Sequence, residues 1–267
     1  MEELKYAIYL LTFRICFINH MNKLWLLQNL KIFQNLSKKD IELIDKLSKM
    51  ENYRKNDIIY IEESQSSYVY VLKKGNIKIS LSTEHGKEFI IEILKPDEIF
   101  GNFGDFSFDG KENFDFLNAE NAFALTDAEV CKFKKEDFDK ILNLYPAISN
   151  RILKLIGLRF KYVSTKIISL AYKSIDTRIA EILIYLVNNF GVTENLLFSS
   201  ECASKNCYQI NIKLTHEEIS NLIGASRQRT TIALDKLKQI GIIDFYKKKI
   251  IIKDLKKLKN ITEFSIN

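Results

Sequence analysis

The residues best suited to recognition chemistry form a short basic cluster, Arg227-Gln228-Arg229, with Thr231 close behind it. Arginine can pair bidentately with guanine and glutamine with adenine, so the cluster suits direct reading of base edges in a DNA groove. Ser226 precedes the cluster and is a good N-cap, which predicts that a helix begins here. A groove-reading helix presents its side chains from these first turns.

A second helix is expected immediately before the cluster. Thr215 and Glu218 have the spacing of a capping box, and Gly224 stands where the chain must enter a left-handed turn. Helical spacing places the buried faces of the two helices at Ile219, Leu222 and Ile223, and at Ile232, Ala233, Leu234 and Leu237. The alternative is an ordinary helical hairpin with a solvated, charged N-terminus.

The residues after the helix pair weigh against an ordinary helical hairpin. Gly241 opens an expected β-hairpin, with strands IIDFY and IIIK and a turn at Lys247-Lys248-Lys249. A helix pair beside a basic-tipped hairpin is a winged helix-turn-helix, and the tip lysines suit phosphate contacts, although a lysine triplet can also be a simple solvated turn. The expected DNA contacts are Thr215, His216, Ser226, Arg227, Gln228, Arg229, Thr231, Lys236 and Lys248.

The charge distribution supports a polyanionic partner. The chain of 267 residues carries a formal net charge of +6. Residues 213–267 hold 12 Lys/Arg against 6 Asp/Glu, while the remainder balances at 28 against 28. A basic C-terminal module on a neutral body points to nucleic acid. The length and the 46% hydrophobic content are those of a globular protein with two domains.

Cysteine and histidine usage argues against metal or disulfide chemistry. The four cysteines show no disulfide framework, and Cys202 and Cys207 are expected as free thiols of a surface loop rather than a redox or metal site. The three histidines are scattered, so we predict no metal site. Reduced thiols favour a cytoplasmic protein. The apolar stretch Leu4–Ile18 is short for a membrane span and lacks the basic start of a signal peptide, so we expect an extra helix or an over-long start, with Met21 a possible initiator, and no membrane.

The N-terminal half changes from a helical to a strand pattern. Leu24–Met50 is expected to be helical, with start signals at Ser37 and Asp40. From Tyr53 onward, short β-rich runs separated by turn signals predict a small antiparallel barrel or jelly roll. These runs are DIIYI, YVYVLKK, NIKISLS, EFIIEIL, EIFG, NAFAL and AEVCKF.

A long helix follows from Pro146 to about Leu170. Its apolar residues step by three and four as in a heptad seam, which favours a dimer interface over a buried intramolecular helix. The seam comprises Leu153, Ile156, Phe160, Val163, Ile167 and Leu170, and a second stripe holds Ile148, Ile152 and Leu155. Another helix is expected over Asp176–Asn189, capped by Asp176 and stopped by Gly191, with short strands at Leu196–Phe198 and Tyr208–Ile212.

From about Leu26 to Leu258 the chain resembles the CRP/FNR family of transcription regulators. The resemblance is carried by Ser164–Ala171, Asp176–Leu183 and Leu214–Leu237, with support from Ala124–Val130 and from turn glycines at Gly75, Gly86 and Gly101. It implies an α+β fold: an antiparallel jelly-roll barrel of the cyclic-nucleotide-binding type, a dimerisation helix and a winged helix-turn-helix. The expected divisions are 1–23 as an extra segment, 24–145, 146–171 and 172–267.

The chain departs from the family's cyclic-AMP binders where they hold the nucleotide. Gly101-Asn102 and Asn118-Ala119 replace a Gly-Glu and an Arg-Ser, and Val163-Ser164 replaces a Thr-Ser pair. Between Pro96 and Glu129 there are nine Asp/Glu and one Lys, the wrong sign for a phosphate. We predict no cyclic-AMP binding and no cofactor. Any effector would meet Asn102, Asn118, Val163 and Ser164.

The family's other sensory chemistries are also poorly matched. Cys16 stands alone where the oxygen sensors of the family carry an iron–sulfur cysteine cluster. The barrel offers no Cys/His haem pair, although an atypical haem held by His85 stays open beside a small neutral or cationic ligand. In the expected recognition helix, Gln228 and Ile232 replace the family's usual Glu and Arg, so the half-site should differ from the family's usual one.

The sequence therefore predicts a homodimeric, sequence-specific DNA-binding regulator of palindromic sites, which is not an enzyme. RNA polymerase is a partner implied by the resemblance, and a small-molecule effector is expected. The first alternative is a constitutive DNA-binding protein whose barrel binds nothing. A metal-dependent barrel enzyme of the cupin type and a membrane-tethered sensor are the other two, and the scattered histidines weigh against the enzyme.

Overall fold

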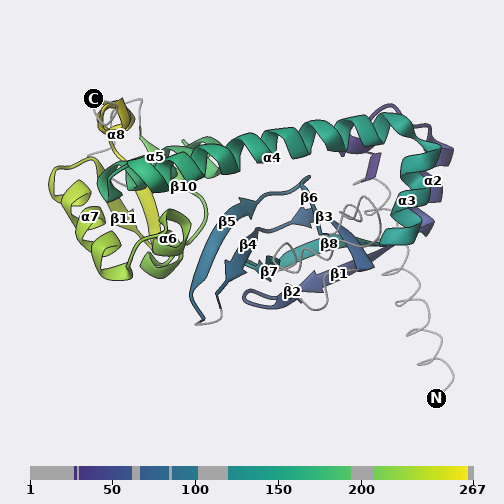
Figure 1. Ribbon diagram of the computed structural model, residues 1–267, viewed down its shortest axis with the longest axis horizontal. Coiled ribbons are helices and arrows are strands. Elements are labelled where there is room, and N and C mark those ends of the chain that lie inside the picture. Colours follow the sequence, from purple (N-terminus) through teal and green to yellow (C-terminus); the bar gives the residue numbers. More distant parts are fainter. Residues whose placement is uncertain are drawn as a thin grey trace, which may run out of the picture. The chain divides into compact units, whose positions relative to one another are not determined.

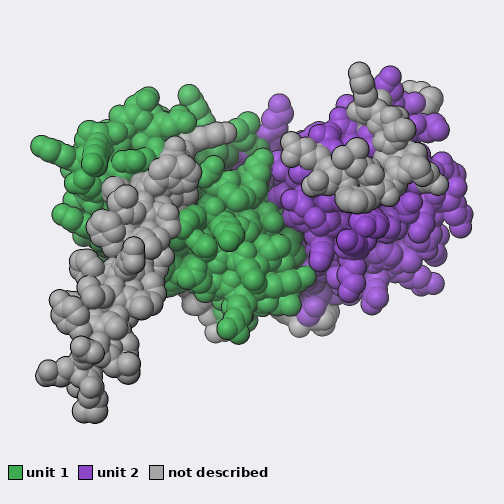
Figure 2. Space-filling view, turned by 180° about the vertical axis from the view of Figure 1, so that it is seen from behind, with its two compact units in different colours: residues 1–82, 92–158 green, residues 83–91, 159–267 purple. Residues whose placement is uncertain are grey.

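The computed structural model describes residues 27–28, 30–61, 67–83, 86–101, 120–193 and 207–263. Contacts divide the chain into two compact units, residues 1–82 with 92–158 and residues 83–91 with 159–267 (Figure 2). The division passes through strand β5 (Glu88–Leu94) and through the long helix α4 (Pro146–Tyr172). Each unit has its own buried core.

The first unit is built on two four-stranded sheets (Figure 1). One has the order β1-β8-β3-β6, formed by Ser48–Tyr53, Ala128–Lys134, Tyr68–Lys74 and Ile99–Gly101. The other has the order β2-β7-β4-β5, formed by Ile58–Tyr60, Glu120–Ala124, Ile77–Ser82 and Glu88–Leu94. The strand pairs β1·β8, β3·β8, β3·β6, β2·β7 and β4·β7 are all antiparallel. This is the expected jelly roll.

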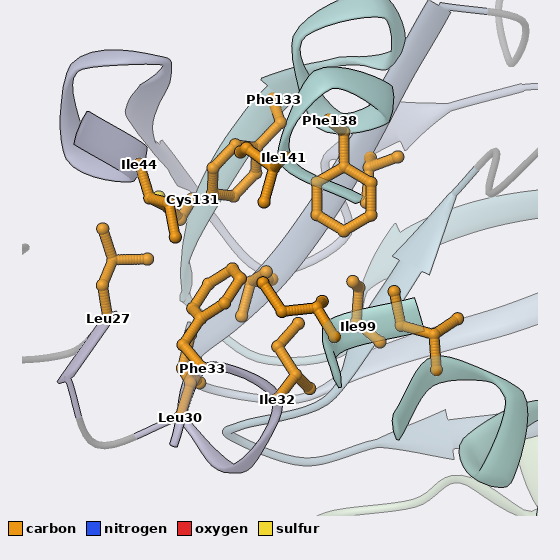
Figure 3. Close-up of a cluster of buried hydrophobic side chains, with 14 of the residues drawn as sticks. Leu27, Leu30, Ile32, Phe33, Ile44, Ile99, Cys131, Phe133, Phe138 and Ile141 are labelled. Carbon is orange, nitrogen blue, oxygen red and sulfur yellow. The ribbon is translucent and has the colours of Figure 1, made fainter. Parts of the chain in front are cut away.

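Alternation along β3 gives its sheet two different apolar faces. Val69 and Val71 belong to a buried cluster with Cys131 and Phe133 of β8 and with apolar residues from helices. Figure 3 shows Cys131 and Phe133 in this cluster. The helices over this face are η1 (Lys31–Phe33), α2 (Lys38–Lys46), α3 (Lys135–Leu144) and the first turns of α4. Tyr70 points the other way, and its ring stacks on Phe100 and Tyr60 at centroid distances of 5.1 and 5.6 Å. Burial raises the pKa of Tyr70 to about 12, so this phenol stays neutral.

Hydrogen bonds fasten the helical layer of the first unit. Ser37 and Asp40 form the capping box of α2, and Asp40 also accepts a bond of 2.7 Å from the Tyr145 hydroxyl after α3. These bonds, with Ser37 first, lower the pKa of Asp40. Arg151 of α4 donates to the carbonyls of Ile32 and Gln34 at 2.9 and 2.6 Å. The start of α4 therefore belongs to the first unit through polar bonds as well as through Ile148 and Ile152.

The second unit combines the end of α4 with helices and a small sheet. The helices are α5 (Ile175–Phe190), α6 (His216–Ile223), α7 (Arg227–Gln239) and α8 (Leu255–Glu263). The sheet has the order β11-β12-β10-β9, from Ile243–Tyr246, Lys249–Ile252, Tyr208–Ile210 and Gly191–Val192. Its core includes Ile179, Leu183 and Leu186 of α5, all at 0% exposure, and α8 packs mainly on α5.

Several expectations about the elements were wrong. Leu24–Met50 is not one helix, because α2 ends at Lys46 and Ser48 begins β1. Ala124–Val130, which the family resemblance matches to the strand that enters the long helix, instead spans the end of β7 and the start of β8, and α3 separates β8 from α4. Ser174, not Asp176, caps α5, where its side chain accepts from the Thr177 amide. Cys207 is buried at 4% exposure rather than on a surface loop, and Cys202 and the strand expected at Leu196–Phe198 lie outside the described residues.

Candidate nucleic-acid interface

Helix α6 begins with a complete capping box. The Thr215 hydroxyl accepts from the Glu218 amide at 3.1 Å, and the Glu218 carboxylate accepts from the Thr215 amide at 2.6 Å. Ile219, Leu222 and Ile223 are buried, as their spacing predicted. The box satisfies two backbone donors that would otherwise lack partners at the helix start, so it fixes where α6 begins.

Gly224 makes the turn between α6 and α7. Its backbone is left-handed, with φ 61° and ψ 45°, which only glycine adopts at no steric cost. A Cβ at this position would approach Leu170 Cδ2 to 2.7 Å. Arg178 of α5 donates from Nη1 to the carbonyls of Ile223 and Gly224 at 2.8 and 3.4 Å. The turn thus requires glycine both for its backbone conformation and for the lack of room beside Leu170, and the Arg178 guanidinium bonds to its carbonyls.

Helix α7 presents the basic cluster to solvent. The Ser226 side chain accepts from the Arg229 amide, and Arg227, Gln228 and Arg229 are exposed. The opposite side is anchored by Ala233, Leu234 and Leu237 and by Thr230, whose hydroxyl donates to the Ser226 carbonyl at 3.0 Å. Ile232 was wrongly placed on the packed face, because it is 61% exposed and therefore accompanies the cluster on the outer side.

The ion pairs of these residues differ in a way that bears on DNA contact. Arg227 Nε lies 3.9 Å from Glu217 Oε2 between two exposed side chains, a weak pair that a phosphate or base can displace. Lys236 is held by Asp176 Oδ2 at 2.6 Å. In the described part of the chain, Arg229 and Lys248 make no ion pair. The side chains more available for contact with DNA are therefore Arg227, Arg229 and Lys248, whereas Lys236 is already paired.

His216 and Thr231 hold the helix pair together from within. His216 Nδ1 lies 2.9 Å from the Thr231 hydroxyl, which joins the first turn of α6 to α7. The His216 ring also packs on Phe245 of β11 at a centroid distance of 5.8 Å. These contacts position both helices against the hairpin. DNA contacts by His216 and Thr231 stay predictions that no contact here tests.

The expected basic hairpin is present as β11 and β12, beside α6 and α7 (Figure 1). Its turn is shorter than expected, because Lys249 already pairs with Tyr246 in the ladder. Lys247 and Lys248 both have positive φ, 49° and 64°, as a two-residue type I′ turn requires. Lys249 instead donates from Nζ to Asn211 Oδ1 at 2.5 Å. Lys248 remains at the exposed tip.

The seam expected on α4 is largely open to solvent. Phe160 is 74% exposed and Leu153 is 68% exposed, and Ile156 and Ile167 are also exposed. Val163 and Leu170 are half-buried. The second stripe behaves differently, since Ile148 and Ile152 are buried in the core of the first unit and Leu155 packs against it. The helix thus has one covered and one uncovered apolar stripe.

Only two of the four expected effector residues lie in the described part of the chain. Asn102 and Asn118 lie outside the described residues, and Val163 and Ser164 are half-buried on α4. The Tyr70 ring lies directly against Gly101, so that a Cβ there would meet Tyr70 Cδ2 at 2.9 Å. Within the described ranges, no group of three or more His, Cys, Asp or Glu could hold a metal ion. The same residues contain no helix long and apolar enough to span a membrane.

Two family models match separate parts of the chain. "Cyclic nucleotide-binding domain" matches residues 50–145, and "Crp-like helix-turn-helix domain" matches residues 177–261, which includes the whole α6–α7 pair and the hairpin. The chain belongs to the CRP/FNR family of transcription regulators. Together, the two matches cover more than half of the sequence.

Curated relatives are similar in sequence to this chain over most of their own length. The "Global nitrogen regulator" of Nostoc sp. (strain PCC 7120) is 27% identical over 201 residues, 75% of this chain and 83% of that protein. The "CRP-like cAMP-activated global transcriptional regulator" of Mycobacterium tuberculosis (strain H37Rv) is 22% identical over 227 residues, 85% of this chain and 94% of that one. A CooA mutant from Carboxydothermus hydrogenoformans shares the fold, with a TM-score of 0.67, 23% identity and coverage of 88% and 96%.

Sequence reasoning missed one residue of this site, Arg178. It lies in the first turn of α5, and its role depends on the turn carbonyls of Ile223 and Gly224, which are 45 and 46 residues away in the sequence. Its place within Asp176–Leu183, one of the stretches that carry the family resemblance, was the only available signal. A contact over that separation leaves no periodic pattern.

Proposed function

We propose that this CRP/FNR-family protein is a homodimeric regulator that reads a palindromic DNA site with the first turns of α7. The observation that carries the proposal is the exposed sequence Arg227-Gln228-Arg229 on a helix whose opposite side is anchored in a core. A capped α6, a glycine turn and a basic hairpin surround it. This arrangement suits a recognition helix in the major groove with Lys248 at a neighbouring phosphate.

The uncovered stripe of α4 supports the dimer. Large apolar side chains that step by three and four along one helix face resemble the seam of a coiled coil, and their exposure costs free energy unless a second surface covers them. A second copy supplies the same stripe in a self-complementary interface. Two recognition helices would then enter successive major grooves about one helical turn apart.

The base preference follows from the side chains at the start of α7. Arg227 is proposed to pair with guanine, and Gln228 favours adenine because its amide matches the adenine edge. Ile232 is exposed beside them and offers an apolar contact, such as a thymine methyl group. The half-site should therefore be related to the family's usual one yet distinct from it.

Selection of bound DNA from a random pool tests the function. We expect a palindromic consensus whose half-sites are centred about 10 base pairs apart, because that spacing equals one turn of DNA. The full-length protein should recover the same consensus in independent selections. Recovery of unenriched random sequence, or of a single half-site without its mate, would contradict sequence-specific binding by a dimer.

The signal is proposed not to be cyclic AMP. The Arg and Glu that hold the nucleotide in the family's cyclic-AMP binders are absent from the matching positions, and the segment around them is acidic. Calorimetric titration of the protein with cyclic AMP should give no heat of binding at micromolar concentrations. A saturable micromolar affinity would overturn this. Tight binding of the selected DNA without any additive would instead support the alternative, a constitutive DNA-binding protein whose barrel binds no effector.

The remaining assignments rest on the family. RNA polymerase is the proposed partner at promoters, and a cytoplasmic location follows from a role in transcription. No enzymatic activity is proposed, and no cofactor. An absorption spectrum of the purified protein tests the haem alternative directly, because a bound haem absorbs strongly in the visible range.

A further inference from the structure

The outward side of helix α7 carries a row of four exposed side chains opposite its buried face. The buried face consists of Thr230, Ala233, Leu234 and Leu237. Because successive helical residues rotate by about 100°, four other side chains fall within about 60° of one another on the far side of the helix. They are Gln228, Ile232, Asp235 and Gln239, all of them exposed. We call this row the outer ridge of α7.

The basic residues of α7 lie on the two flanks of the outer ridge. Arg227 and Lys238 are on one flank, and Arg229 and Lys236 are on the other, each about 70–110° from the centre of the ridge. The ridge itself has one charged side chain, that of Asp235. In a helix that lies in the major groove, the ridge faces the base edges, whereas the flanks lie nearer to the two phosphate backbones. The long side chain of Arg227, at the helix start, can still reach a base from its flank.

The Asp235 carboxylate has no partner among the residues that the structure describes. Lys238 follows three residues later, at a spacing that allows an ion pair along a helix, but its ammonium lies 3.6 Å from Asp244 Oδ1 instead. Lys236 is held by Asp176 at 2.6 Å. The acceptor atoms of Asp235 are therefore open to a donor that approaches from the outer side of α7.

We propose that Asp235 is a specificity-determining residue that accepts a hydrogen bond from the N4 amino group of a cytosine in the half-site. This inference rests on the proposed function, because it requires α7 to lie in the major groove. An ionised carboxylate only accepts hydrogen bonds. Guanine and thymine offer acceptor oxygens in the major groove and would repel it, whereas cytosine offers a donor. Asp235 thus discriminates by rejecting wrong bases as well as by binding the right one.

The helix geometry places this contact relative to that of Gln228. Asp235 follows Gln228 by seven residues, which is about 10 Å along the helix axis. Base pairs rise by about 3.4 Å each, so the cytosine should lie about three base pairs from the base that Gln228 contacts. Ile232 lies between the two on the ridge, at the spacing that suits the base pairs between them.

The same carboxylate should also weaken binding to DNA of the wrong sequence. Binding to random DNA depends on attraction between basic residues and phosphates, and a negative charge between the two basic flanks reduces that attraction. On the right site, the donor of the cytosine offsets this repulsion. Asp235 should therefore widen the gap between specific and non-specific affinity.

Replacing Asp235 by Asn tests both effects, because the amide keeps the shape and removes the charge. The position is exposed, so the variant should fold normally, as circular dichroism can check. Selection from a random DNA pool at one salt concentration compares the variant with the wild-type protein. The cytosine preference at one base pair should fall at least about fivefold, with adenine gaining, because an amide matches the adenine edge. Affinity for random DNA, measured by fluorescence anisotropy, should rise about twofold or more.

Glu263→Gln is the matched control, since it removes the same charge at an exposed position of α8, outside the helix pair. Its consensus should equal that of the wild-type protein. An Asp235→Asn protein that keeps the entire consensus would overturn the proposed role, even with tighter binding to all DNA, because the carboxylate would then only repel phosphates. A wild-type consensus with no cytosine at that distance would overturn it as well. Enrichment of no sequence by the wild-type protein would instead refute the proposed function itself, and the role of Asp235 with it.

Discussion

Replacing Phe160 by Glu is expected to convert the protein into a monomer. Phe160 is 74% exposed in the middle of the uncovered stripe of α4, and a charge there would be buried without a partner in the dimer. Losing the partner should weaken binding to the palindromic site by about 100-fold or more, because the second half-site then no longer adds to affinity. Sedimentation equilibrium measures the association, and fluorescence anisotropy with labelled DNA measures the affinity.

The helix offers a matched control for this change. Leu158 is 67% exposed but lies about 200° around the helix from Phe160, since successive residues rotate by about 100°. Leu158→Glu introduces the same charge at a similarly exposed apolar position outside the seam, so the dimer should persist. If both variants dissociate, or if Phe160→Glu remains dimeric, the seam is not the interface. Circular dichroism ensures that the comparison is between folded proteins.

Replacing Arg227 by Ala is expected to weaken binding to the selected site by about 1–3 kcal/mol and to relax the preference at one base pair. The reason is that a bidentate arginine contact carries sequence information, whereas a phosphate contact does not. Arg227 is exposed, and its only described ion pair is the long contact with Glu217. Competition between the selected site and single-base variants measures both effects.

Lys248→Ala provides the comparison. Lys248 lies at the tip of the hairpin, so its removal should weaken selected and random DNA equally and lower the slope of log affinity against log salt by about one. An Arg227→Ala protein that lost equal affinity for selected and random DNA would show that Arg227 contacts only the backbone.

Local signals in the sequence located much of the fold. The Thr215 capping box, the Gly224 turn and the Ser226 cap depend on residues within a few positions of one another, and all three are present. The strands β3 and β5 match the expected runs residue for residue, because buried β-branched and aromatic residues bounded by turns leave a clear pattern.

The errors arose where local signals were ambiguous or absent. Ser48–Tyr53 is polar and follows a helical pattern, so only its pairing with β8 makes it a strand. Asp176 and Ser174 are both acceptable caps by residue type. In the structure Ser174 caps α5, and Asp176 lies in the first turn and pairs with Lys236. The ion pair of Lys236 likewise depends on a partner far away in the sequence, Asp176, and periodicity does not encode such a contact.

In the two-residue turn of the hairpin, the positive charge of the side chains conflicts with the preferred backbone conformation. Lys247 and Lys248 both occupy the left-handed region, where Asn-Gly would be relaxed and a lysine is strained. The pair Asn-Gly would therefore stabilise the hairpin while removing two positive charges from its tip. A variant selected only for heat resistance would drift toward that pair and would lose the phosphate contact that we propose for Lys248. At these two adjacent residues, a change that raises the stability of the hairpin lowers the positive charge offered to DNA.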